Sequence, residues 1–117
     1  MIEAALCEVQ SRGITITRRA LFNWCNPDGT WSDTPVACDA LGAVLIANNK
    51  ASSGFPKGWL SDICRILNTD TYWLWRFWLG FDNGTPLIII ICKDGSEERR
   101  EDSVSKLGVK MAKKFCS

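Results

Sequence analysis

The side chains that could support chemistry in this chain are carboxylates, thiols and basic groups, because the sequence contains no histidine. This excludes the usual general base, the usual metal ligand and the Ser–His or Cys–His nucleophile pair. A hydrolytic site would have to use carboxylates or lysine, but turn formation or helix capping explains most of the candidate aspartates. No catalytic residue is therefore predicted, and an enzyme is the less favoured class. The aspartates considered are Asp28, Asp33, Asp39, Asp62, Asp70, Asp82 and Asp94.

Six cysteines are spread along the chain, and we expect them to be reduced and mainly structural. Several fall on the apolar side of predicted helices, where a free thiol behaves as a small hydrophobic group. Their spacing contains no Cys-x-x-Cys pair, so a zinc site would require four distant thiolates. The sequence also lacks a glycine-rich phosphate loop. We therefore predict no metal and no cofactor.

Asp39 and Arg76 are each the isolated charge of an otherwise apolar predicted helix. Burying an unpaired charge is unfavourable, so each must reach solvent, bind a polar ligand or find a partner. The favoured interpretation is that the two residues pair and fix how their helices cross. Two alternatives stay open for Arg76: it extends past its aromatic neighbours to solvent, or it holds a carboxylate or phosphate in bidentate fashion.

Residues 71–81, "TYWLWRFWLGF", contain half of the chain's twelve aromatic side chains. A capping residue before them and the stop signal "FDNGTP" after them favour a helix, although the alternation would also suit a strand. Large aromatic residues usually pack in a core, but a chain of this length has a limited interior. Some aromatic surface should therefore remain for a partner. The candidate interaction or ligand residues are Tyr72, Trp73, Trp75, Arg76, Trp78, Asp39 and, on the turn-rich loop 26–35, Trp31.

The other predicted elements are also mostly helical, as judged from apolar spacing and capping signals. Residues 14–25 fit either a short extended piece or a short helix, and we leave this open. The run "LIIIIC", the turn "KDG" and the charged "SEERRE" predict a hairpin with a solvated edge strand. Helices are predicted over 2–12, from Pro35 to Ala47 with Thr34 as the cap, over 59–67, over the aromatic segment, and from Asp102 or Ser103 to Phe115.

Together these elements predict one compact domain over residues 1–117. It is α+β and mostly helical, with four or five helices packed around a central aromatic helix and one small β-hairpin near residues 86–101. The composition, 46% hydrophobic and 23% charged, is that of a globular chain, and the net charge of +1 offers no field to attract nucleic acid or an anionic membrane. A secretory signal and a span of ~20 apolar residues are both missing, so we expect a soluble protein of a bacterial-type cytoplasm.

Residues 59–80, with two short helices joined near Asn68 and Thr69, resemble the helix-turn-helix of bacterial repressors. The resemblance implies that Thr71, Tyr72 and Arg76 would approach DNA. A recognition helix has a polar outer face, however, and this one is aromatic and has no basic stripe around it. The favoured function is a non-enzymatic protein-interaction domain that binds a protein partner or itself, as a homodimer, through the aromatic surface. A DNA-binding regulator is the alternative, and a small-ligand binder or an enzyme using carboxylate and arginine chemistry is third.

Overall fold

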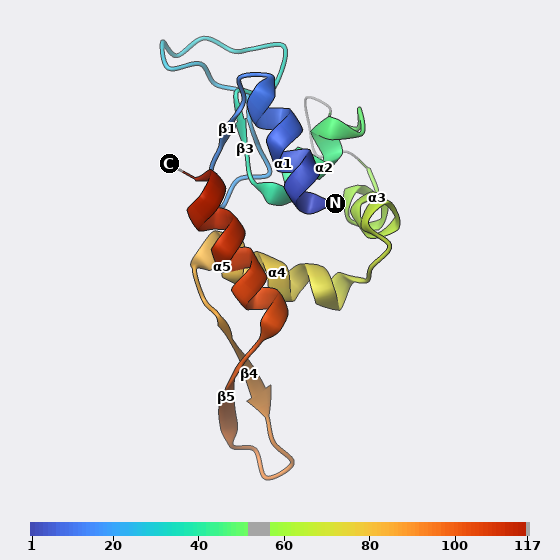
Figure 1. The fold of residues 1–117 in the computed structure, drawn as a ribbon, viewed down its shortest axis with the longest axis vertical. Coiled ribbons are helices and arrows are strands. Elements are labelled where there is room, and N and C mark those ends of the chain that lie inside the picture. The colour runs from blue at the N-terminus through green and yellow to red at the C-terminus, as the bar shows by residue number, and fades with distance from the viewer. Residues whose placement is uncertain (52–56, 117) are drawn as a thin grey trace.

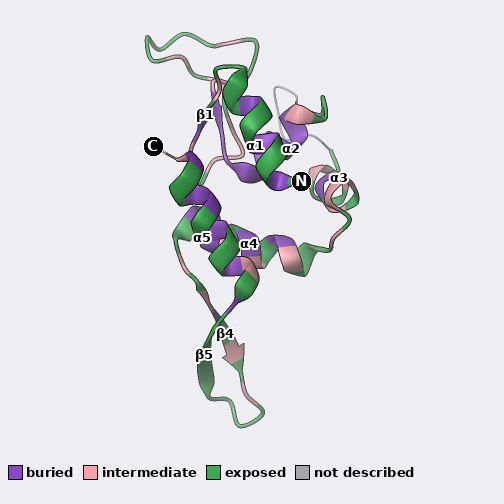
Figure 2. Ribbon diagram, viewed as in Figure 1, coloured by how far each residue is buried: buried purple, intermediate pink, exposed green. Residues whose placement is uncertain are grey.

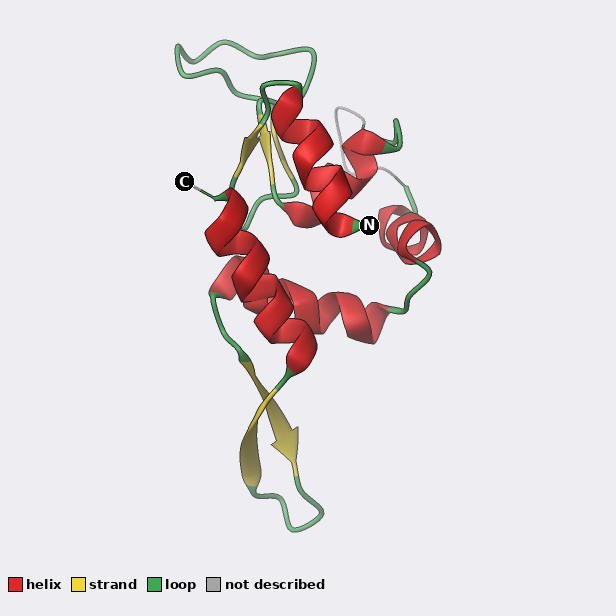
Figure 3. Cartoon of the chain, viewed as in Figure 1, coloured by secondary structure: helices red, strands yellow, loops and turns green. Residues whose placement is uncertain are grey.

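The computed structural model describes residues 1–51 and 57–116, which form five helices and two small sheets (Figure 1, Figure 3). The fold is therefore α+β and mostly helical, with 48% of the described residues in helices, as the sequence predicts. Within the described ranges, no helix combines the length and apolar character that crossing a membrane requires. The helices are α1 (Ile2–Ser11), α2 (Ala40–Ala47), α3 (Trp59–Leu67), α4 (Thr71–Asn83) and α5 (Ser103–Phe115). The strands are β1 (Thr15–Ile16), β2 (Phe22–Asn23), β3 (Ala37–Cys38), β4 (Leu87–Ile91) and β5 (Glu97–Glu101).

The N-terminal half packs α1 and α2 beside a small three-stranded sheet in the order β1-β3-β2. Strand β3 pairs in parallel with β1 and antiparallel with β2. The segment 14–25, which the sequence left open, thus contains two short strands and no helix. Helix α1 buries Ile2, Leu6 and Val9, which recur at the spacing of one helical face.

Helix α2 begins later than predicted, so the expected start at Pro35 with Thr34 as the cap is wrong. Residues 37 and 38 pair with strands on both sides, and the helix starts only at Ala40. Asp39 is the N-cap, and its Oδ1 accepts the Gly42 backbone N–H at 2.9 Å. The apolar composition of this helix matches its surroundings, because all residues from Ala40 to Ile46 are buried.

The C-terminal half is built on the crossing of α4 and α5, where backbone meets backbone. A Cβ atom at Gly80 would lie 1.8 Å from the Ser105 carbonyl oxygen, and one at Gly108 would lie 2.3 Å from the Phe77 carbonyl oxygen. Only glycine fits at such a contact. The two helices therefore approach more closely than side chains would allow, and Phe77 and Phe81 are almost completely enclosed.

The predicted hairpin is present as β4 and β5, which extend away from the helices (Figure 1). The protein is consequently elongated, with principal extents of 52 × 28 × 25 Å. Buried residues gather where the helices meet, whereas the outer part of the hairpin is largely exposed (Figure 2).

Candidate interaction surface

An open groove with a volume of about 560 Å³ lies between α3 and α4, and we call it the aromatic groove. Among the described residues, its lining contains no charged side chain. Two buried leucines, Leu41 and Leu74, form its floor, and four side chains around it, those of Leu60, Tyr72, Trp75 and Trp78, are more than one third exposed. The lining residues are Leu41, Trp59, Leu60, Thr71, Tyr72, Leu74, Trp75 and Trp78.

Helical periodicity divides the aromatic side chains of α4 between the core and the groove. Trp73, Phe77 and Phe81 are spaced by four residues and form a stack toward the interior, with ring centroids 5.5 and 5.9 Å apart. Tyr72, Trp75 and Trp78 recur every three residues on another face and are 55%, 44% and 38% exposed, respectively. A single helix thus supplies both a core and a surface, which its composition alone cannot separate.

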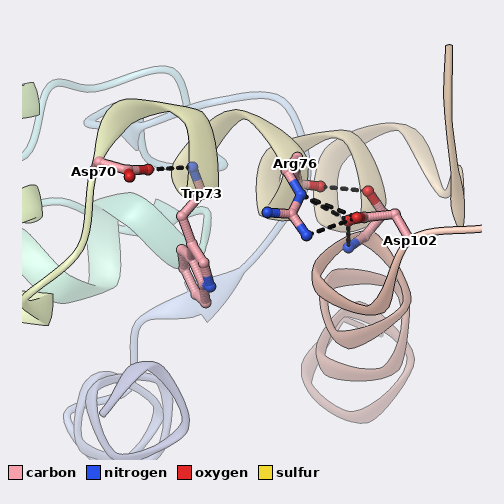
Figure 4. Close-up of polar contacts among 5 residues, drawn as sticks. Asp70, Trp73, Arg76 and Asp102 are labelled. Carbon is pink, nitrogen blue, oxygen red and sulfur yellow. Dashed lines mark hydrogen bonds and ion pairs between the residues drawn. The ribbon is translucent and has the colours of Figure 1, made fainter. Parts of the chain in front are cut away.

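The start of α4 is fixed by Asp70, whose Oδ1 accepts the backbone N–H of Trp73 at 2.8 Å (Figure 4). This cap satisfies one of the backbone donors that a helix leaves unpaired at its first turn. Asn68 ends α3 in the left-handed conformation. A connection of three residues between two well-defined helix ends therefore holds the two walls of the groove together.

Arg76 pairs with Asp102, the N-cap of α5, so the predicted pairing of Arg76 with Asp39 is wrong (Figure 4). Its Nη2 and Nε atoms donate to the Asp102 carboxylate at 2.7 to 3.1 Å. The physical reason is where the two acidic caps lie. Asp39 lies at the N-terminus of α2, whereas Asp102 lies at the N-terminus of α5, beside the middle of α4. The guanidinium that the repressor-like reading would direct to DNA is held within the chain.

The Arg76–Asp102 pair also affects the charge of both groups and the position of a groove residue. Hydrogen bonds from Arg76 lower the pKa of Asp102, and the same bonds raise the pKa of Arg76. The guanidinium carbon lies 5.0 Å from the centroid of the Tyr72 ring, a cation–π distance. Arg76 does not line the groove, so its role is to hold Tyr72 and α4 against α5.

The second isolated charge, Asp39, lies beside another acid, Asp82, in the last turn of α4. The two side chains are only 4% and 2% exposed, respectively, and Oδ2 of Asp82 has no hydrogen-bond partner among the described residues. Burial, followed by the charge of Asp82, raises the pKa of Asp39 to about 8. Burial also raises the pKa of Asp82. Burial of two adjacent carboxyl groups thus favours the retention of one proton by the pair near neutral pH.

The sequence could have indicated that Asp82 is unusual. An acidic residue in the last turn of a helix opposes the helix dipole, so its presence there requires a specific neighbour. That neighbour is the N-terminus of α2 with its cap Asp39. Arg19 approaches from the β1–β2 connection, where its Nε donates to the Asp82 main-chain carbonyl at 3.3 Å. Because both carboxyl groups are enclosed, they join the two halves of the protein and are not exposed to a substrate.

The structure brings together only some of the candidate residues. Tyr72, Trp75 and Trp78 share the aromatic groove, whereas Trp73 lines a separate cavity of about 370 Å³ beside α1 and α5. Trp31 is 68% exposed on its loop and does not line the groove. Sequence reasoning missed the opposite wall. The feature of the sequence that indicates this wall is the adjacent apolar pair Trp59 and Leu60. The pair makes the apolar face of α3 wider than one contact with the core requires.

All six cysteines are free of disulfide bonds. Across residues 1–51 and 57–116, no three or more Cys, Asp or Glu side chains are grouped so that they could hold a metal ion. No protein-family model matches the chain, and no curated protein or solved structure matches it. The arrangement of its own side chains is thus the basis for any functional assignment.

Proposed function

We propose that the protein is a non-enzymatic interaction domain whose aromatic groove binds an amphipathic helix of another protein. The observation that carries this proposal is the exposure of Tyr72, Trp75 and Trp78 along one uncharged groove. Tyrosine and tryptophan are the residues that contribute most binding energy at protein interfaces, because they offer large rigid contact areas. Three of them side by side on a surface helix are unfavourable in water unless a partner covers them.

The shape of the groove favours a helix as the partner. A hollow between two helices accepts a ridge, and an amphipathic helix presents one as apolar side chains at positions i, i+3 or i+4, and i+7. Two copies of the groove would each present a hollow, so they do not interlock. A helix from a different protein is therefore the occupant that this surface fits.

The chemistry of the lining specifies the face of that helix. The described lining of the groove offers indole, phenol, leucine and threonine side chains and no charge. The inserted side chains should accordingly be leucine, isoleucine, methionine or phenylalanine, because an inserted charge would lose its hydration without gaining a partner. Binding should also depend little on salt, since no ion pair is buried.

Contacts within the chain hold one side of the groove in place without a partner. Its α4 wall is held by the Asp70 cap and by the Arg76–Asp102 pair, and the rings of Tyr72 and Trp75 stack with centroids 6.1 Å apart. Side chains that are already ordered lose little conformational freedom on binding. Because the groove itself loses little conformational freedom, the binding free energy can offset the ordering of a partner that folds into its helix on contact.

The test is selection of helical peptides from a displayed library against the whole protein, followed by titration of synthetic peptides monitored by tryptophan fluorescence. We expect selected peptides to carry apolar residues at helical spacing. The double variant Trp75→Ala/Trp78→Ala should weaken their binding by at least about 100-fold, because two hot-spot aromatics are removed.

The matched control is Trp31→Ala, which removes an exposed tryptophan outside the groove and should leave the affinity unchanged. Selected peptides without helical periodicity would contradict the choice of occupant. Equal losses in the groove variant and the control variant would show that binding does not use the groove.

A further inference from the structure

The β4–β5 hairpin is a second surface that the proposed groove function does not use. A hairpin of two strands is marginally stable in water unless more strands or a helix cover it. Here only the base is covered: Ile88 is buried, whereas Ile89 and Ile91 are 52% and 65% exposed. All five residues of β5 are exposed. Isoleucine side chains on a projecting two-stranded sheet point to a missing neighbour.

The hydrogen-bonding pattern of the hairpin shows which backbone groups of β4 are not bonded to β5. Cys92 N–H donates to the Ser96 carbonyl at 2.8 Å, and Asp102 N–H donates to the Pro86 carbonyl at 3.0 Å. Because bonding alternates along an antiparallel strand, the even-numbered residues of β4 bond to β5. The odd-numbered residues, Leu87, Ile89 and Ile91, therefore direct their N–H and C=O groups to the outer edge. The sheet has only these two strands, so this edge is open within the described chain.

The two edges of the hairpin differ in charge. β5 reads "EERRE", and charged side chains on an edge strand discourage the addition of another strand. β4 reads "LIIII", with no charge, proline or glycine. The hairpin is thus closed to strand addition along β5 and open to it along β4.

We infer that the β4 edges of two copies of this chain pair antiparallel about a two-fold axis at Ile89, forming one four-stranded sheet in the order β5-β4-β4-β5. In this register Ile89 faces Ile89 of the second copy, and Leu87 faces Ile91 of the second copy. All three residues are of the outward-bonding type, so the pairing supplies about six backbone hydrogen bonds. A shift by one residue would pair inward-directed groups and lose them.

Symmetry and charge select a second copy over any other strand. Antiparallel pairing of two identical edges is self-complementary and uses both edges completely, so association stops at a dimer. The outer strands of the new sheet are then the two charged β5 strands, which is how natural sheets end. The same register places Lys93 opposite Thr85 of the second copy, one residue beyond the C-cap of α4, where the helix dipole favours a positive charge.

The test compares two proline variants at directly opposed positions. Ile89 and Arg99 face each other across the hairpin, and each directs its N–H away from it. Ile89→Pro and Arg99→Pro therefore remove one outward donor each and leave the hairpin's own ladder intact. By sedimentation equilibrium we expect the wild-type chain and Arg99→Pro to have twice the 13.1 kDa monomer mass. Ile89→Pro should raise the dimer dissociation constant by at least about tenfold.

Two further measurements keep the comparison decisive. Circular dichroism of both variants should match that of the wild type. If it shows that proline disturbs the hairpin, Ile89→Lys is the substitute variant, and it should also dissociate the dimer. A monomeric wild-type chain at millimolar concentration would overturn the inference, as would a dimer that survives both Ile89 variants. Assemblies that grow beyond two copies would overturn the two-fold register. The groove variant Trp75→Ala/Trp78→Ala should remain dimeric, so failure of the groove proposal and failure of the dimer are distinguishable.

Discussion

Asp39 at the N-terminus of α2 and Asp82 near the C-terminus of α4 lie with their carboxyl groups together in the interior, where the two halves of the chain meet. Two negative charges cannot be buried at such a contact, so one proton is retained. A group whose pKa rises on folding binds its proton more tightly in the native state. Its contribution to the free energy of unfolding is therefore largest below its ordinary pKa of 3.8 and is lost as the pH rises toward about 8.

The first prediction follows from this pair. Asp39→Asn should raise the free energy of unfolding by about 1–3 kcal/mol at pH 8, because an amide needs no proton and can donate to the unpartnered Asp82 oxygen. Asparagine keeps the N-cap. Urea unfolding followed by circular dichroism at pH 5 and pH 8 measures the effect. Asp70→Asn, at an exposed cap, is the control; an equal gain there, or the same gain at both pH values, would contradict a buried shared proton.

The second prediction concerns Arg76 and Asp102. Asp102→Asn keeps the cap on α5 but removes the ion pair, and should lower the free energy of unfolding by about 1–3 kcal/mol at pH 7. Asp102 stabilises the fold above its ordinary pKa of 3.8, and this contribution is lost as the pH falls through the lowered native value. The loss in Asp102→Asn should therefore shrink in acid. A double-mutant cycle with Arg76→Gln measures the coupling, and additive losses would show that the pair contributes nothing.

The third prediction concerns the crossing of α4 and α5. Gly108→Ala should lower the free energy of unfolding by about 2–3 kcal/mol, because the added Cβ would lie 2.3 Å from the Phe77 carbonyl oxygen. The sign of the change in the free energy of unfolding is informative, because replacing glycine by alanine in an unhindered helix stabilises the protein by about 1 kcal/mol. Thermal unfolding gives the measurement, with Lys110→Ala on the exposed side of α5 as the control. A stabilised Gly108→Ala protein would refute the close approach.

The fourth prediction separates the two aromatic faces of α4. Phe77→Ala should destabilise the protein by about 3–5 kcal/mol, because Phe77 is fully buried. Trp75→Ala should lower the free energy of unfolding by no more than about 1 kcal/mol, since 44% of the side chain is exposed. Denaturant unfolding of the two variants tests the division. Comparable losses would mean that Trp75 belongs to the core and not to the groove.

The fold class and the hairpin were predictable because they depend on local patterns. Apolar spacing marks α1, α3 and α5, and the "LIIIIC" run, the "KDG" turn and the charged return strand mark β4 and β5. The start of α2 was not predictable from such patterns. Pro35 after Thr34 imitates a helix start, but Ala37 and Cys38 pair with β1 and β2, and tertiary contacts of this kind override local propensity.

The candidate site was indicated by the sequence only in outline. The small interior of the chain suggested that α4 would leave some aromatic surface uncovered, but the sequence did not indicate which side chains; in the structure the exposed ones on α4 are Tyr72, Trp75 and Trp78. The partner of Arg76 was not predictable. Asp102 reads as an ordinary cap for α5, and only the helix crossing at Gly80 and Gly108 brings it to Arg76.

The direct connection of α4 to α5 through the hairpin also affects the order in which the elements form during folding. Contacts within residues 71–115 close short loops, and segments of this kind form quickly. The N-terminal half depends on distant partners, as in the bond from Gln10 Nε2 to the Phe115 carbonyl at 3.3 Å. We therefore expect refolding to begin with the two C-terminal helices and to finish when α2 docks. Proton uptake by Asp39 and Asp82 would then accompany the last step, and a pH-indicator signal would follow the secondary-structure signal in a stopped-flow experiment.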